Sequence, residues 1–80
     1  MSTTATTPVT IVPKTVQWIR ETLKLTQDEM AVRLGLNHRS QVLHLESGRT
    51  HIAGAKLVLL ELMLAEAEKK AGRKVPRFRA

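Results

Sequence analysis

Gly35 is the residue that most constrains the fold, because it ends a segment whose capping signals are those of a short helix. Thr26 is a good helix cap, since its hydroxyl can accept a hydrogen bond from a free backbone amide of the first turn. Asp28 and Glu29 then lie where negative charge favours a helix N-terminus. A helix is therefore expected to begin near Gln27 and to end at Gly35, where glycine adopts the left-handed conformation at low steric cost.

A second short helix is expected directly after this turn. Asn37 is placed to cap it, with His38 as the rival cap, and the helix is expected to run through Ser47 and to stop at Gly48. Two short helices joined by a tight turn in this way form an angled pair.

The second helix has the pattern of one buried face and one polar face. Val42 and Leu45 are three residues apart and can face inward together. The outer and flanking positions are held by Arg39, Ser40, Gln41, Leu43 and His44. Arginine suits the guanine edge, glutamine the adenine edge and serine either one, and a small helix fits the major groove of DNA. The pattern therefore indicates base readout, although any solvated helix also shows a polar face.

The stretch from about Val16 to Leu64 resembles the helix-turn-helix domain of the Cro and phage-repressor type regulators, known as the XRE family. The resemblance implies an all-α domain that binds double-stranded DNA. It is carried by Arg20 in WIRETLKL, Thr26 and Gln27 in LTQDEMA, Leu34 and Gly35 at the turn, and Leu45, Glu46, Ser47, Gly48 and Arg49 in LESGRT.

The resemblance also implies roles for individual residues. Arg20 of the first helix is expected to pair with Glu46, at the end of the second helix of the motif, as a structural ion pair. The residues that the resemblance places at DNA phosphates are Gln27, Arg49 and Thr50. We expect His51 to lie near phosphates with them, because it also follows the end of the second helix.

The chain departs from the family pattern in one place. Between Gly35 and Val42 it holds one residue more than the family's commonest spacing. Whether this residue lengthens the turn or adds to the start of the second helix decides if His38 or Arg39 occupies the first base-reading position. The candidate base-contacting residues are Arg39, Ser40 and Gln41, followed by His44 and His38.

Composition narrows the class of partner. With 80 residues the chain is expected to form one small domain, of a size that commonly gains stability from a partner subunit. The formal net charge of +6 favours a polyanion, although charge alone does not separate DNA from RNA or from an acidic protein. RNA is disfavoured, because A-form RNA closes its major groove to helices and aromatic stacking residues are nearly absent from the sequence.

The sequence also argues against several classes of site. It contains no cysteine, and the spacing of His38, His44 and His51 does not match known metal-ligand patterns, so we expect no metal. No glycine-rich phosphate loop, no nucleophile with a base and no pair of acids points to an enzyme or to a cofactor. Since neither an apolar run of membrane-spanning length nor a secretory signal is evident, a cytoplasmic location is expected.

The two ends of the chain differ in composition from its middle. Residues 1–12 are rich in threonine and are expected to be extended, with a disordered beginning. The apolar run VTIV at residues 9–12 fits a loose lead-in that packs on the domain, or a strand that pairs with its copy in a dimer or with residues 75–78. Residues 13–71 are expected to form the folded domain, with a first helix from Pro13 to Lys24.

Residues 72–80 are expected to form a basic tail. The last twelve residues carry six positive charges and no acid, at Lys69, Lys70, Arg73, Lys74, Arg77 and Arg79. Such a tail fits an arm that lies along DNA phosphates. It also fits a solvated segment that adds only solubility.

The last helix is expected from about Ala53 to Ala71 and is apolar nearly all round. One face can cover the core, so we expect the second apolar side to bind a copy of the chain. The predicted dimer interface comprises Leu57, Leu60, Met63 and Leu64. A wholly buried central helix is the alternative, which is difficult to build in so short a chain.

The sequence thus predicts an all-α helix-turn-helix domain of four to five helices. We expect a homodimeric repressor that binds an inverted-repeat operator, acts by occupancy and regulates its own operon, as small phage and plasmid regulators do. The alternative is an antitoxin whose main partner is a toxin protein and for which DNA binding is secondary.

Overall fold

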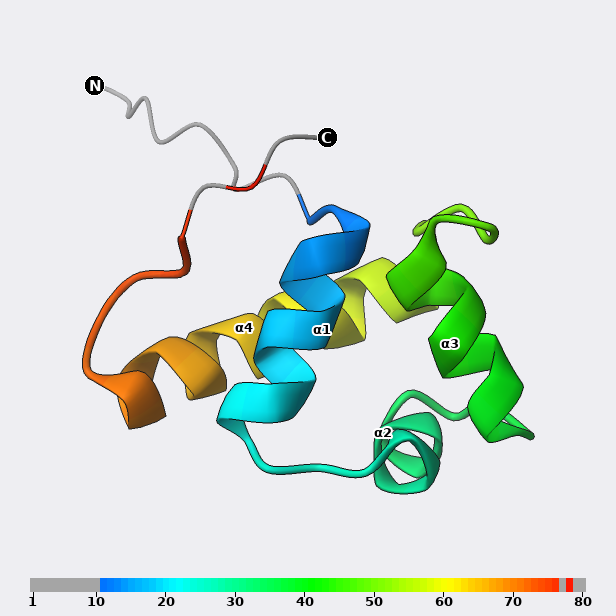
Figure 1. Ribbon diagram of the computed structural model, residues 1–80, viewed down its shortest axis with the longest axis horizontal. Coiled ribbons are helices and arrows are strands. Elements are labelled where there is room, and N and C mark those ends of the chain that lie inside the picture. The colour runs from blue at the N-terminus through cyan, green and yellow to red at the C-terminus, as the bar shows by residue number, and fades with distance from the viewer. Residues whose placement is uncertain (1–10, 77, 79–80) are drawn as a thin grey trace.

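The computed structural model describes residues 11–76 and residue 78, which form four helices and contain no strand. The helices are α1 (Pro13–Thr22), α2 (Gln27–Arg33), α3 (Arg39–Ser47) and α4 (Ala55–Ala71), and their arrangement is shown in Figure 1. The predicted all-α class is confirmed. The predictions for residues 1–10 and for Arg77 and Arg79 lie outside the described residues.

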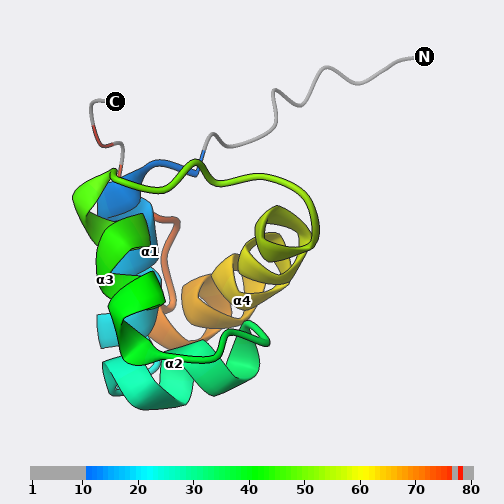
Figure 2. The same ribbon diagram turned by 90° about the vertical axis from the view of Figure 1, so that its right-hand side faces the viewer.

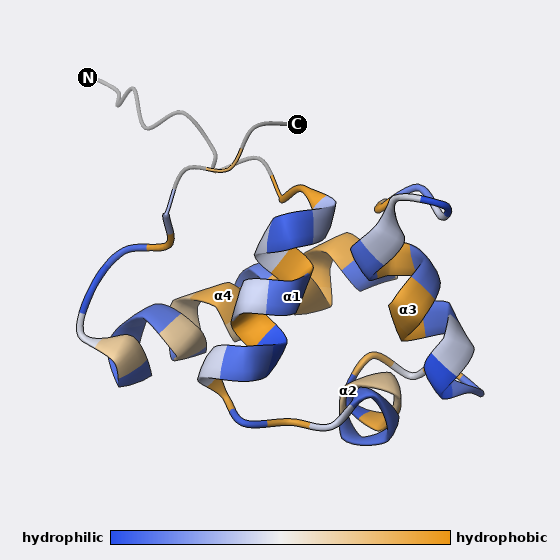
Figure 3. Ribbon diagram, viewed as in Figure 1, coloured by the Kyte–Doolittle hydropathy of each residue, from blue (hydrophilic) through white to orange (hydrophobic). Residues whose placement is uncertain are grey.

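Helix α1 lies at the centre of the fold and packs against α3 on one side and α4 on the other, while α2 packs against α3 (Figures 1 and 2). All four helices contribute to one core. Hydrophobic residues gather where α1 crosses α4, as the colouring of Figure 3 shows. The largest fully buried side chains are Val16, Ile19, Met30, Val42, Leu45 and Leu60.

The predicted start of α2 is confirmed by its cap. Thr26 Oγ1 accepts a hydrogen bond from the Glu29 amide at 3.1 Å, and Glu29 Oε1 accepts one from the Thr26 amide at 2.8 Å. These two bonds satisfy amides that have no partner inside the helix. Helix α2 therefore begins at Gln27, as the sequence predicts.

The predicted end of the first helix was too late by two residues. Helix α1 ends at Thr22, because Lys24 adopts a left-handed φ of 58° that breaks the helix. The Leu25 amide then donates back to the Arg20 carbonyl at 2.9 Å, which closes the last turn.

The turn between α2 and α3 settles two questions that the sequence left open. Gly35 has a φ of 70°, and the Leu36 amide donates to the Ala31 carbonyl at 2.8 Å, so α2 ends at this glycine turn as expected. The cap of α3 is His38, whose Nδ1 accepts from the Ser40 amide at 3.1 Å. The extra residue therefore lengthens the connection, residues 34–38, and Arg39 is the first residue of α3.

Helix α4 begins at Ala55, two residues later than expected, because Gly54 adopts a φ of 65° just before it. Its inner face completes the core with four buried residues, Leu60, Met63, Leu64 and Ala67. Its outer face exposes two large apolar side chains, Val58 at 56% and Leu62 at 65%. Apolar residues therefore lie on both sides of this helix, as its composition predicts.

The segments that flank the four helices also pack on the domain. Ile11 and Val12 are buried, so these two residues of the N-terminal run pack on the domain as the lead-in interpretation describes. After Gly72, the Val75 amide donates to Glu68 Oε2 at 2.9 Å, and the Val75 side chain packs against the core. None of the described helices is long and apolar enough to cross a membrane.

Candidate nucleic-acid interface

A cluster of three polar side chains joins α1, α2 and α3. Arg20 Nε lies 2.6 Å from Glu46 Oε2, and Arg20 Nη2 lies 3.4 Å from Glu46 Oε1. Gln27, the first residue of α2, donates through Nε2 to the same Glu46 Oε1 at 3.5 Å. The structure thus contains the Arg20–Glu46 pair that the resemblance implies, and this pair holds the start of α2 beside the end of α3.

The ion pair is largely shielded from water. The side chains of Arg20 and Glu46 are 18% and 8% exposed, and Arg20 Nη1 also donates to the Leu25 carbonyl at 3.3 Å. Charged groups that lose water need such close partners, because an unpaired charge in this position would be costly. The orientation of α3 relative to α1 and α2 is therefore fixed by a charged contact in addition to apolar packing.

Helix α3 buries one face and exposes the other. Val42 and Leu45 are 0% and 1% exposed, and they anchor the helix in the core. Away from this face His44 is half-buried, and Arg39 is exposed at the first position of the helix. Arginine and histidine side chains can both hydrogen-bond to base edges or phosphates.

The other candidate base readers take part in capping α3. Gln41 is exposed, but its Oε1 accepts from the amides of Asn37 at 2.8 Å and His38 at 3.2 Å. Ser40 is half-buried, and its Oγ lies 3.0 Å from His38 Nδ1. Bidentate recognition of adenine requires both the oxygen and the nitrogen of a glutamine amide. In this conformation the amide nitrogen of Gln41 is therefore available for a base, while its oxygen accepts hydrogen bonds from the backbone before α3.

The segment after α3 presents the residues expected at phosphates. Gly48 has a φ of 85°, and the amides of Arg49 and Thr50 both point back to the His44 carbonyl, at 2.9 and 3.3 Å. Arg49 and His51 are exposed and Thr50 is half-buried. The chain therefore leaves α3 through a sharp turn that places these side chains beside the end of the helix.

The predicted dimer interface on α4 requires correction. Leu60, Met63 and Leu64 are only 0%, 4% and 6% exposed, because they fill the core between α4 and the other helices. Leu57 is half-buried against the same core. The prediction that these residues face a second copy is therefore wrong for the three buried ones. The large apolar side chains exposed on α4 are instead Val58 and Leu62, which the apolar pattern of the sequence does not separate from the buried residues.

The beginning of the basic tail is attached to the domain. The Arg73 guanidinium lies 6.0 Å from the centre of the Trp18 ring, a distance at which a cation is attracted to an aromatic face. Phe78, Trp18 and the side chains of Lys14, Gln17 and Glu21 line a shallow pocket of about 230 Å³ on α1. Arg73 and Phe78 of the tail therefore both lie beside side chains of α1.

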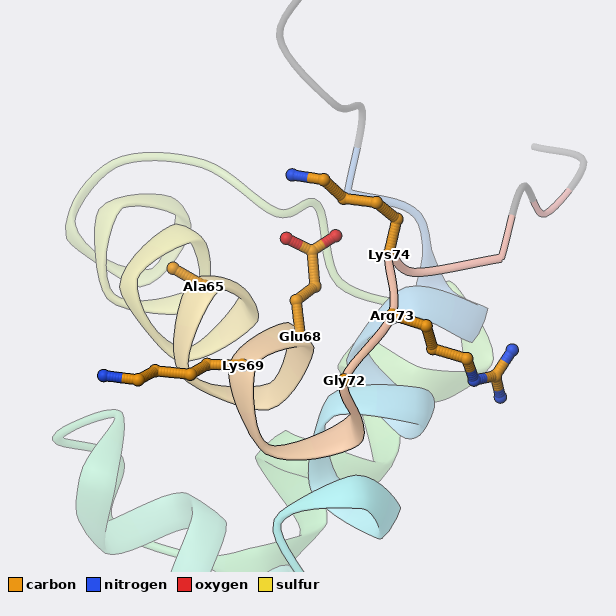
Figure 4. A pocket seen from close by; sticks show the side chains of 6 residues that line it. All are labelled: Ala65, Glu68, Lys69, Gly72, Arg73 and Lys74. Carbon is orange, nitrogen blue, oxygen red and sulfur yellow. The ribbon is translucent and has the colours of Figure 1, made fainter.

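A second depression lies where α4 ends, and it is lined by Ala65, Glu68, Lys69, Gly72, Arg73 and Lys74 (Figure 4). The three basic side chains point in different directions, and Glu68 stands between them (Figure 4). They do not converge on one point, so this depression lacks the geometry of an anion site. Among the described residues, no group of three histidine, aspartate or glutamate side chains could hold a metal ion.

Comparison with known protein families identifies the family of this chain. The model of a helix-turn-helix family matches residues 16–67, a range that runs from the buried face of α1 to the last buried residue of α4. It includes both α2 and α3 and the whole Arg20, Gln27 and Glu46 cluster. No match was found among curated proteins or among solved structures.

Proposed function

Because this chain belongs to the XRE-type helix-turn-helix family and is a DNA-binding transcriptional regulator, we propose that it is a homodimeric repressor that recognises an inverted-repeat operator. The observation that carries the proposal is the geometry of α3. Its inner face is locked by core packing and by the Arg20–Glu46 pair, while its outer face presents hydrogen-bonding side chains. A rigid helix with a polar outer face is what readout in the major groove requires.

In this proposal the first turn of α3 enters the major groove. Arg39 binds a guanine edge through its guanidinium, and His44 reads the next accessible position along the helix. Ser40, Gln41 and His38 lie at the same end of α3 and contact bases or nearby phosphates with the polar atoms that capping leaves available.

The backbone of the DNA is held on both sides of the reading helix. Gln27 at the start of α2 contacts one phosphate, since a helix N-terminus favours negative charge and Glu46 holds the Gln27 side chain beside α3. Arg49, Thr50 and His51 contact a second stretch of backbone just beyond the end of α3. Phosphate contacts of this kind fix the register of the protein on DNA without reading its sequence.

The outer face of α4 supports the dimer. Val58 and Leu62 lie one turn apart on this helix and are both more than half exposed. Burying them against a copy of themselves would remove apolar surface from water without disturbing the core. A two-fold dimer presents two α3 helices to half-sites about 34 Å apart, which is one turn of DNA. Occupancy of such a site at a promoter, including that of its own operon, would exclude RNA polymerase.

Selection from random duplex DNA tests this proposal. The full chain is incubated with a random library and competitor DNA near physiological salt, and the bound fraction is sequenced. An enriched inverted repeat with half-sites one turn apart would support a dimeric reader. Retarded DNA without an enriched sequence would show electrostatic binding alone, and the proposed operator recognition would then fail.

An antitoxin remains the second candidate, and the exposed apolar residues of α4 favour it as well. Val58 and Leu62 could bind a different protein instead of a second copy. Co-expression with the product of the neighbouring gene separates the two cases. A stable heteromeric complex that is lost in Leu62→Lys would favour the antitoxin, whereas a homodimer that is lost in the same variant would favour the repressor.

A further inference from the structure

Leu43 is the one large apolar side chain of α3 that the fold leaves exposed. It is 50% exposed, whereas its neighbours Val42 and Leu45 are 0% and 1% exposed. A leucine in this position adds little to the core, so packing does not account for it. Because half of its surface is accessible, the Leu43 side chain is available to contact a partner that approaches the outer side of α3.

The position of Leu43 on the helix ties it to the DNA-reading side. It lies one turn beyond Arg39 and one turn before Glu46, and residues three or four apart share a side of an α-helix. Glu46 binds Gln27 at the start of α2. Leu43 therefore lies between the first base-reading position and the edge of α3 that faces the α2 N-terminus.

Capping of α3 makes this apolar position more important for specificity. The oxygen of Gln41 and the hydroxyl of Ser40 are already engaged by Asn37 and His38. Fewer polar atoms of the first turn are thus available to distinguish bases by hydrogen bonds. The major groove offers one apolar feature on a base edge, which is the 5-methyl group of thymine.

We propose that Leu43 is a specificity-determining residue that packs against the 5-methyl group of a thymine in each half-site. This inference rests on the proposed operator recognition and deepens it, because it names a base and a chemical group that α3 reads without a hydrogen bond. The same contact accepts 5-methylcytosine, which carries its methyl group at the same position.

The expected size of the effect follows from the area of one methyl group. Burying a methyl-sized apolar group is worth about 0.8 kcal/mol, which corresponds to about a fourfold change in affinity. Replacing a thymine by deoxyuridine removes this methyl group and leaves the hydrogen-bonding groups of the base unchanged. The discrimination between the two bases therefore isolates the contact.

The experiment uses the full chain and two random duplex libraries, one synthesised with thymine and one with deoxyuridine. Sequences enriched from the thymine library are then remade with deoxyuridine at one position at a time, and binding is measured for wild type and Leu43→Ala. Val32→Ala serves as the matched control, because Val32 is 77% exposed but lies on α2. Both variants are at exposed positions, and circular dichroism checks that they fold.

We expect one position per half-site at which wild type and Val32→Ala bind thymine about fourfold more tightly than deoxyuridine. At this position Leu43→Ala should bind the two bases equally. Equal binding of thymine and deoxyuridine by wild type would overturn the inference and leave operator recognition intact. A preference that persists in Leu43→Ala, or loss of self-association in that variant, would also overturn it. No enriched sequence in either library would instead overturn the proposed function itself.

Discussion

Helices α3 and α4 are each joined to another helix by one arginine–carboxylate pair, but water reaches the two pairs to different extents. Arg20 on α1 binds Glu46 on α3 with side chains that are 18% and 8% exposed. Arg33 on α2 binds Glu66 on α4 at 2.9 Å, with side chains that are 40% and 52% exposed. The two ion pairs therefore differ in their effect on stability. An exposed ion pair adds little. Breaking a shielded one is costly, because it leaves a charge without water or a partner.

The outer faces of α3 and α4 also differ, because that of α3 is mostly polar and that of α4 exposes large apolar side chains. Around Leu43, α3 presents polar side chains to solvent, whereas α4 presents Val58 and Leu62. The shielded ion pair thus orients α3, the helix to which we assign base reading, where precise orientation matters most. The exposed pair lies on the helix whose outer face we assign to a second copy of the chain.

The largest effect is expected inside α4, where a buried and an exposed leucine are two residues apart. Leu60→Ala should lower the free energy of unfolding by about 3 kcal/mol, because it leaves a cavity in the core. Leu62→Ala should leave this free energy almost unchanged but weaken self-association. Urea denaturation and sedimentation measure the two properties. A larger loss of stability in Leu62→Ala than in Leu60→Ala would reverse our assignment of the two faces.

The second-largest effect is expected at the shielded ion pair of Arg20 and Glu46. Arg20→Ala should lower the free energy of unfolding by about 2 to 3 kcal/mol, because Glu46 is left without its main partner. The preferred DNA sequence should stay the same, since neither residue reads a base. Glu46→Ala and the double variant complete a cycle in which the two losses should not add. Additive losses would mean that the pair contributes nothing as a pair.

On the outer face of α3, Arg39→Ala should cost about 1 to 3 kcal/mol of binding free energy on the selected operator. It should leave the stability of the fold unchanged, because Arg39 is exposed. Arg33→Ala is the matched control, since it removes an arginine that lies away from α3. Binding titrations on the selected and a scrambled duplex measure the difference. An equal loss on both duplexes would mean that Arg39 contacts phosphate and reads no base.

The smallest effect is expected at the exposed pair, and it depends on pH. The hydrogen bond from Arg33 lowers the pKa of the Glu66 carboxyl below its ordinary value. A carboxyl whose pKa is lower in the folded state stabilises the fold above its unfolded pKa, and this contribution disappears as the pH falls through the folded pKa. Wild type should thus be slightly more stable than Arg33→Ala at neutral pH and equal to it in acid. Thermal melts of both proteins across this range measure the gap, and a gap that widens in acid would contradict the assignment.

The sequence predicted α2, the turn and α3 well, because the signals that begin and end these helices are local. Thr26 and Glu29 cap α2 with side chains three residues apart, and Gly35 and Gly48 supply the left-handed conformations that end two helices. The family resemblance added the long-range pair of Arg20 and Glu46, which spacing alone does not reveal. The choice between Asn37 and His38 as cap depended on one residue of turn length, and the structure decided it.

The sequence predicted α4 less well, because a helix that is apolar on most sides has no strong periodic signal. Leu60 and Leu62 look equivalent in such a pattern, yet the crossing of α1 over α4 buries the first and exposes the second. The contact of Arg33 with Glu66 and the attachment of Arg73 to Trp18 depend on the same tertiary arrangement. Local signals carry no information about it.

We propose that α3 enters the major groove with Arg39 at a guanine, and methylation interference tests this placement. The selected operator is treated with dimethyl sulfate, which methylates N7 of guanine in the major groove and N3 of adenine in the minor groove. We expect methylation of one guanine in each half-site to block binding by wild type. The same methylation should not change the binding of Arg39→Ala. Interference only at adenine N3, or the same guanine pattern in both proteins, would contradict it.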